Sequence, residues 1–153
     1  MQARPYPAWI SRLFIFSVAM LAATGMMQMP LAHRYFITEI PGMAWTGDFF
    51  LVHRLHYLFA ALLLFVVGLA AVNWLLEWRD RLALTPLGAV RAAMVGGLLV
   101  SGGLRVYRNL PGVTLDPVVV VSIEWVHLVL FMTLGAVALL ALFRRVSAYA
   151  VRR

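Results

Sequence analysis

Residues 49–74 read FFLVHRLHYLFAALLLFVVGLAAVNW, and after Arg54 this stretch holds no Asp, Glu, Lys or Arg. An apolar run longer than about 18 residues is typical of a helix that crosses a membrane. Three further apolar runs occur along the chain. We therefore predict four membrane-spanning helices, at about residues 9–29, 49–74, 87–104 and 118–143.

The composition supports a membrane protein throughout. Of 153 residues, 63% are hydrophobic and 12% are charged, with a mean hydropathy of +0.89. A soluble domain carries about 25% charged residues, so a soluble enzyme, a disordered tail and a nucleic-acid-binding module are excluded. The length fits one all-α domain over residues 1–153, an integral membrane four-helix bundle. With no cysteine, the chain itself forms no disulfide, cysteine-ligated zinc site or iron–sulfur cluster.

The basic residues predict the orientation of the helices. The net charge is +7, and all 13 basic residues are arginine. Cytoplasmic loops of membrane proteins are enriched in basic residues. With the N-terminus inside, the inner side holds nine arginines and the outer side four (Arg34, Arg54, Arg105 and Arg108). We therefore expect both termini in the cytoplasm, and expect the charge to set topology rather than to bind nucleic acid.

Ionisable side chains inside membrane helices are costly and indicate function. His33 lies in the first outer loop, where a solvated imidazole needs no further explanation. At about 1.5 Å per residue, His56 lies roughly 9–10 Å and His127 roughly 13 Å from the outer ends of their helices. The second and fourth helices run in the same direction, so the two imidazoles can converge inside the bundle, where cofactor sites are built.

Two facing imidazoles match the axial ligands of a b-type haem. We expect His56 and His127 to bind the iron, with His53, one helical turn nearer the outer end, as the alternative to His56. Hydrogen bonding of each histidine across helices is the structural alternative.

Other residues near the outer face bear on this site. Arg105, Arg108 and Arg54 are candidate partners of the haem propionates, since arginine binds carboxylates with a planar fork. Ordinary anchoring at the interface explains the arginines equally well. Glu124 lies one turn before His127 and could orient it or handle a proton. The third helix is rich in small residues, which favour close helix packing or the approach of a flat ring: Gly96, Gly97, Ser101, Gly102 and Gly103. No internal repeat is visible.

The chain resembles the four-helix cytochrome b subunits of formate dehydrogenases and thiosulfate reductases, within the prokaryotic cytochrome b561-like superfamily. The resemblance covers the whole chain in topology. The segments that carry it are Ser11-Arg-Leu-Phe-Ile-Phe16, Thr24-Gly25, Arg54-Leu-His-Tyr57 and Glu124-Trp-Val-His127. Such subunits sit in the bacterial inner membrane and pass electrons between a redox partner and quinone through two stacked b haems.

The resemblance implies that His56 and His127 hold the outer haem. Its inner-haem ligand positions correspond to Ile15 and a residue near Ala141, and the inner half contains no histidine. The resemblance therefore implies one haem b, an iron–sulfur or cytochrome partner subunit, and a quinone in the surrounding lipid.

The predicted function is that of a non-catalytic electron-transfer subunit in a larger oxidoreductase complex of the respiratory chain. Two alternatives from other classes remain. One is a haem-free anchor or assembly subunit of a respiratory or photosynthetic complex, and the other is a small transporter.

Overall fold

The protein is described by a computed structural model that covers residues 7–29, 36–144, 146 and 148–153. Within these residues, four helices are long and apolar enough to cross a membrane, as the sequence predicts. The chain divides into two compact units, Met1–Arg79 and Asp80–Arg153. Each unit is built on one pair of consecutive long helices and is described by itself. His33 and Arg34 lie outside the described residues.

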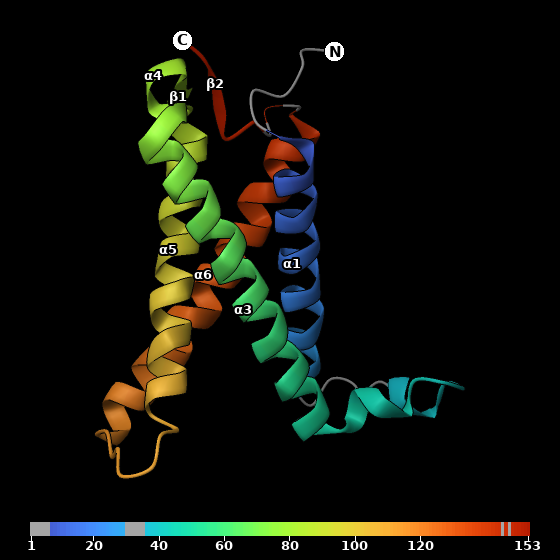
Figure 1. The fold of residues 1–153 in the computed structure, drawn as a ribbon. Helices are drawn as coiled ribbons and strands as arrows, with labels where there is room; N and C mark the ends of the chain where they lie inside the picture. The colour runs from blue at the N-terminus through green and yellow to red at the C-terminus, as the bar shows by residue number, and fades with distance from the viewer. Residues whose placement is uncertain (1–6, 30–35, 145, 147) are drawn as a thin grey trace. The chain divides into compact units, whose positions relative to one another are not determined.

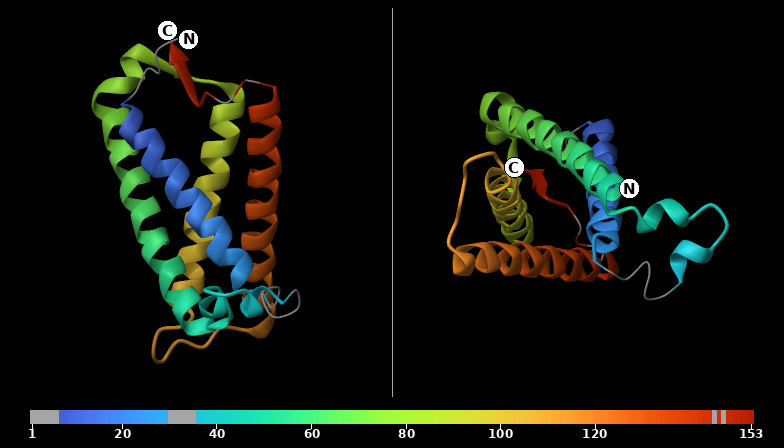
Figure 2. Two further views of the ribbon diagram at one scale, coloured as in Figure 1. Left: turned by 90° about the vertical axis from the view of Figure 1, so that its right-hand side faces the viewer. Right: turned by 90° about the horizontal axis from the view of Figure 1, so that it is seen from below.

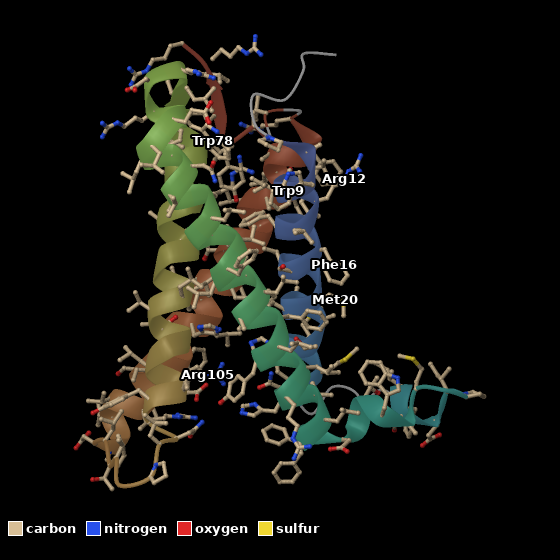
Figure 3. All side chains as sticks on the ribbon, in the orientation of Figure 1. Trp9, Arg12, Phe16, Met20, Trp78 and Arg105 are labelled. Atoms are coloured by element: carbon tan, nitrogen blue, oxygen red, sulfur yellow. The ribbon has the colours of Figure 1, made fainter. Side chains whose placement is uncertain are left out.

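The first unit is a helical hairpin of α1 (Ala8–Met27) and α3 (Phe49–Asn73), which run antiparallel (Figure 1). The connection between them contains two short 3-10 turns, η1 (Ile37–Glu39) and η2 (Ala44–Gly47). Asp48 caps α3, because its Oδ1 accepts a hydrogen bond of 3.0 Å from the backbone N–H of Leu51. Trp9 near the start of α1 and Trp78 beyond the end of α3 lie toward the same end of this hairpin (Figure 3).

The α3 helix continues beyond the predicted end at Trp74. A π-helical turn, η3 (Trp74–Trp78), leads into α4 (Arg79–Arg81), so the helical run extends from Phe49 to Arg81. The apolar run stops at the charged residues Glu77, Arg79, Asp80 and Arg81. Arginine is nevertheless a good helix former, so the helix continues into these residues.

The second unit is a hairpin of α5 (Pro86–Tyr107) and α6 (Pro117–Phe143), which lie side by side and antiparallel (Figure 2). Both helices begin in the same way. Thr85 Oγ1 accepts from the N–H of Gly88 at 2.9 Å, and Asp116 Oδ1 accepts from the N–H of Val118 at 2.8 Å. A proline follows each cap, where its fixed φ suits the first helical turn.

Two features of the second unit differ from the prediction. The α5 helix includes Arg105 and ends at Tyr107, three residues beyond the predicted end at Leu104. A cation in the last helical turn interacts favourably with the helix dipole, so the helix has no reason to stop before Arg105. The chain also forms a two-stranded antiparallel sheet of β1 (Leu82–Leu84) and β2 (Ala150–Arg152), in which Ala83 pairs with Val151.

Burial in this chain follows the pattern of a membrane protein. Many large apolar side chains on the long helices are exposed, including Phe65 at 61% and Phe143 at 80%. Three hydroxyl side chains of the long helices are instead buried, and each bonds to its own helix: Ser17, Thr24 and Ser101. Ser17 Oγ donates to the carbonyl of Leu13 at 2.8 Å. This arrangement suits hydrocarbon surroundings, where each polar group must be satisfied within the protein.

The C-terminal segment packs against the start of α5. The Arg91 side chain is only 4% exposed, and its guanidinium lies 4.1 Å from the centre of the Tyr149 ring. Thr85 Oγ1 donates to the carbonyl of Ala148 at 3.0 Å. A β-carbon on Gly88 would overlap the carbonyl group of Tyr149 and would come within 2.8 Å of Thr85 Oγ1. The segment therefore approaches α5 so closely that only glycine fits at position 88.

Replacement of Gly88 by alanine tests this packing. We expect Gly88→Ala to lower the free energy of unfolding by about 1–3 kcal/mol, because the backbone of the C-terminal segment must move. A β-carbon on Gly96, in the same helix, would point into open space. Gly96→Ala is therefore the matched control, and it should leave stability unchanged or raise it by up to about 1 kcal/mol. The readout is the melting temperature of the detergent-solubilised protein, and equal melting temperatures would contradict the packing.

Candidate functional site

His56 on α3 is held by the neighbouring helix of its own hairpin. Its Nδ1 lies 2.9 Å from the hydroxyl oxygen of Thr24 on α1, and Thr24 is 1% exposed. The same hydroxyl donates to the backbone carbonyl of Met20 at 2.8 Å. Gly25 follows Thr24, and a β-carbon there would lie 3.4 Å from Cε1 of His56. A hydroxyl and a glycine thus form the surface against which this imidazole packs.

His127 on α6 is held in the same way in the other hairpin. Its Nδ1 lies 2.9 Å from the hydroxyl oxygen of Ser101 on α5, and Ser101 is 4% exposed. This hydroxyl donates to the backbone carbonyl of Gly97 at 2.8 Å. Gly102 follows Ser101, and a β-carbon there would lie 3.5 Å from Cε1 of His127.

The two hairpins therefore repeat one arrangement that is not visible as a sequence repeat. In each, a hydroxyl residue and a glycine on the first helix face a histidine on the second. The hydroxyl residue is threonine in one hairpin and serine in the other, and it precedes its histidine by 32 and 26 residues, respectively. Because His56 and His127 belong to different units, their convergence on one cofactor stays a prediction.

His53, the alternative ligand, has different surroundings. Its Nδ1 lies 3.2 Å from Oε1 of Gln28, just beyond α1. Its ring stacks on Phe49, with centroids 5.5 Å apart and planes 16° apart, and lies 4.4 Å from the ring of Tyr57. Two of the partners of His53, Gln28 and Phe49, thus come from the loop end of the hairpin, whereas His56 contacts a buried hydroxyl and a glycine. The duplicated arrangement favours His56 as the counterpart of His127.

The predicted arginines at the end of α5 bind a carboxylate of the protein. Glu124 on α6 lies 3.1 Å from Nη2 of Arg105 and 2.6 Å from Nη2 of Arg108. Figure 3 shows Arg105 near the end of α5. This cluster carries a net charge of +1. Arg105 lies one helical turn from Ser101, and Glu124 lies one turn from His127, whereas Arg108 lies about two turns from Ser101. Arg54, the third predicted partner of a propionate, is exposed.

Sequence reasoning missed the residue that orients His127. It considered Glu124 for that role, but Glu124 binds the two arginines, and the hydrogen-bond partner of His127 is Ser101. The available signal was the pair Ser101-Gly102, which matches Thr24-Gly25 in the first helix. Both pairs lie near the end of their helix that leads to the next histidine-bearing helix.

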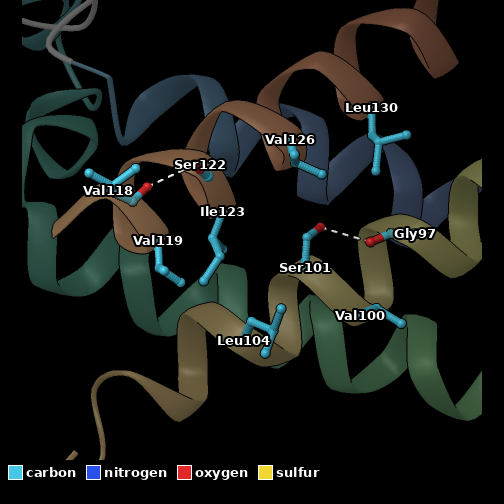
Figure 4. A pocket seen from close by; sticks show the side chains of 10 residues that line it. All are labelled: Gly97, Val100, Ser101, Leu104, Val118, Val119, Ser122, Ile123, Val126 and Leu130. Atoms are coloured by element: carbon cyan, nitrogen blue, oxygen red, sulfur yellow. Dashed lines mark hydrogen bonds between the residues drawn. The ribbon is translucent and has the colours of Figure 1, made fainter. Parts of the chain in front are cut away.

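A groove of about 500 Å³ lies between α5 and α6 on the face that carries Ser101 (Figure 4). Valine and leucine side chains make most of its lining. Its two hydroxyls are bonded to their own helices, Ser101 to Gly97 and Ser122 to Val118, the latter at 2.7 Å. The groove therefore presents a hydrocarbon surface beside the residue that holds His127.

No protein-family model, curated protein or solved structure matches the chain. Within residues 7–29, 36–144, 146 and 148–153, no three His, Asp or Glu side chains gather as a metal-ion site. Any function must therefore be inferred from the geometry of the two hairpins.

The ion cluster gives a stability prediction. Replacing Glu124 by glutamine leaves two neighbouring guanidinium groups without the anion between them. Because the three side chains are partly exposed, at 24–37%, we expect Glu124→Gln to lower the free energy of unfolding by about 1 kcal/mol. The loss should shrink at high salt, which screens the repulsion between the arginines.

Glu39→Gln, an exposed carboxylate in η1, is the matched control and should have no effect on the melting temperature in detergent. Equal melting temperatures for Glu124→Gln and Glu39→Gln would show that the cluster adds nothing to stability.

Proposed function

We propose that this protein is a membrane electron-transfer subunit that carries one b-type haem, with His56 and His127 as its axial ligands. One observation carries the proposal. Each of the two histidines lies within a membrane-spanning helix and is bonded through Nδ1 to a buried hydroxyl, in the same arrangement in both hairpins. Because Nδ1 of each imidazole lies against a hydroxyl, Nε2 would be the nitrogen that binds the iron.

The residues fit this cofactor. A hexacoordinate b haem takes two axial nitrogens, and the chain offers one from each hairpin. Ligating histidines almost always donate from the second ring nitrogen to a fixed acceptor. Thr24 and Ser101, whose hydroxyl oxygens lie 2.9 Å from Nδ1 of His56 and His127, would fill that role. The glycines beside the imidazoles keep the space around the Cε1 edges clear of side chains.

The haem, when bound, supplies one-electron redox chemistry, and the chain supplies its ligands and surroundings. Arg105 and Arg108 are the residues that would pair with the propionates. Because both already bind Glu124, they would hold the propionates in exchange for that carboxylate or beside it. The apolar side chains of the membrane helices would keep water away from the site.

The partners follow from the surroundings of the helices. We propose that an iron–sulfur or cytochrome subunit docks at the loop ends of the hairpins, close to both histidines, and exchanges electrons there. A quinone dissolved in the lipid would be the other partner. We further propose that the chain spans the bacterial inner membrane with both termini in the cytoplasm, as the arginine distribution indicates.

The cofactor assignment is tested by haem content. Purified protein should show b-type bands in a reduced-minus-oxidised spectrum and one haem per chain in a pyridine haemochrome assay. His56→Ala and His127→Ala should each lose most of the haem, since each removes an axial ligand.

His53→Ala is the matched control, because it lies one turn away on α3, and it should keep the haem. Haem retained in His127→Ala would refute the ligand assignment. A correctly inserted wild-type protein without haem would refute the cytochrome proposal and favour the anchor alternative.

The orientation is tested by labelling, for which the absence of cysteine makes the chain suitable. Glu39→Cys in η1 and Arg144→Cys just beyond α6 place single thiols at exposed positions. In intact cells, a membrane-impermeant maleimide should label position 39 and should leave position 144 unlabelled until the membrane is opened. The reverse pattern would invert the proposed topology.

A further inference from the structure

We propose that Thr24 and Ser101 are positioning residues that fix His56 and His127 as the same tautomer, protonated on Nδ1, and thereby set the reduction potential of the iron. The statement about the iron rests on the proposed function. The statement about the tautomer concerns the protein alone, so the two can fail separately.

The tautomer follows from counting protons. A hydroxyl has one proton to donate and two lone pairs that accept. Thr24 donates its proton to the carbonyl of Met20 at 2.8 Å, a distance that matches a good O–H···O bond. Its oxygen can then only accept from His56, whose Nδ1 lies 2.9 Å away. Nδ1 of His56 therefore carries the proton, and Nε2 carries the lone pair that a metal requires.

The second hairpin gives the same result independently. Ser101 donates to the carbonyl of Gly97 at 2.8 Å, and its oxygen lies 2.9 Å from Nδ1 of His127, so by the same count it accepts from that nitrogen. Both distances join residues of the second unit only. Each glycine that follows the hydroxyl residue lets the imidazole edge come close to the helix backbone. The same hydroxyl–carbonyl and hydroxyl–imidazole distances occur in both hairpins, which indicates that the fold itself selects the tautomer.

The same bonds bear on the iron. An acceptor on Nδ1–H draws the proton away from the ring and makes the imidazole a stronger donor to a metal. A stronger donor favours the oxidised iron, so it lowers the reduction potential. Because each hydroxyl acts on a different ligand of the iron, removal of both should raise the potential more than removal of either one.

The chain offers matched controls for these hydroxyls. Ser17 on α1 and Ser122 on α6 bond to the carbonyls of Leu13 and Val118, as Thr24 and Ser101 bond to carbonyls of their own helices. Ser17→Ala and Ser122→Ala therefore remove a hydroxyl of the same kind from the same unit without touching either hydroxyl–imidazole pair. The exchange variants Thr24→Ser and Ser101→Thr keep the acceptor and should behave as the wild type.

The first experiment uses the full chain without haem and measures ¹⁵N chemical shifts of the labelled imidazoles in detergent micelles. In the wild type, His56 and His127 should both show a protonated Nδ1 and a lone pair on Nε2. Thr24→Val should move only His56 toward a mixture of tautomers, and Ser101→Ala should move only His127. Imidazoles in the wild type protonated on Nε2, or variants without effect, would overturn the inference.

The second experiment measures the midpoint potential of the haem-loaded protein. Thr24→Val and Ser101→Ala should each raise the potential, and the double variant should raise it more than either single variant. The exchange variants and the two serine controls should keep the wild-type value. Unchanged potentials would overturn the proposal that the two hydroxyls set the reduction potential of the iron, even if the tautomers are as proposed. A protein that binds no haem but shows the expected ¹⁵N shifts would refute the proposed function alone.

Discussion

A polar side chain inside a membrane helix must find its hydrogen-bond partner within the protein, because hydrocarbon offers none. In this chain the requirement governs where hydroxyls and imidazoles lie. Ser17 satisfies it with its own helix. Thr24 and Ser101 satisfy it twice, once with a carbonyl of their own helix and once with the histidine of the next helix. The second bond ties each pair of helices together at a defined depth.

These two bonds connect the fold to the proposed activity. A histidine that only fastened two helices would serve its purpose with either ring nitrogen protonated. In the proposed arrangement the hydroxyl gives its proton to a backbone carbonyl, so the imidazole would be protonated on Nδ1 and would carry the lone pair of a metal ligand on Nε2. Under the proposed function, the contact that joins the two helices of each hairpin would also orient its histidine for coordination.

Different interactions hold the water-facing ends of the second unit. At the loop end, Glu124 joins two arginines and links α5 to α6. At the opposite end, the buried Arg91 lies over Tyr149, and the absence of a side chain at Gly88 lets the C-terminal segment reach α5. The charged groups thus lie toward the ends of the helices, and the hydroxyl–imidazole bonds lie within the apolar helices that are long enough to span a membrane.

The sequence by itself determined the four spans and the residues that face an energetic penalty in the membrane. Both follow from local hydropathy, which depends only on neighbours along the chain. The ends of the predicted helices therefore agree with those of α1, α3, α5 and α6 to within three residues. The exception is the helical run beyond Trp74, which continues to Arg81. The sequence also singled out His56 and His127.

Only the tertiary structure decided the partners of these residues. The pairing of Ser101 with His127, the engagement of Glu124 by Arg105 and Arg108, and the strand pair at Ala83 and Val151 join residues far apart in the chain. Hydropathy along the chain does not predict such pairs. A helix presents its side chains all around its axis, and the packing of a second helix decides which side chains of the two helices contact each other.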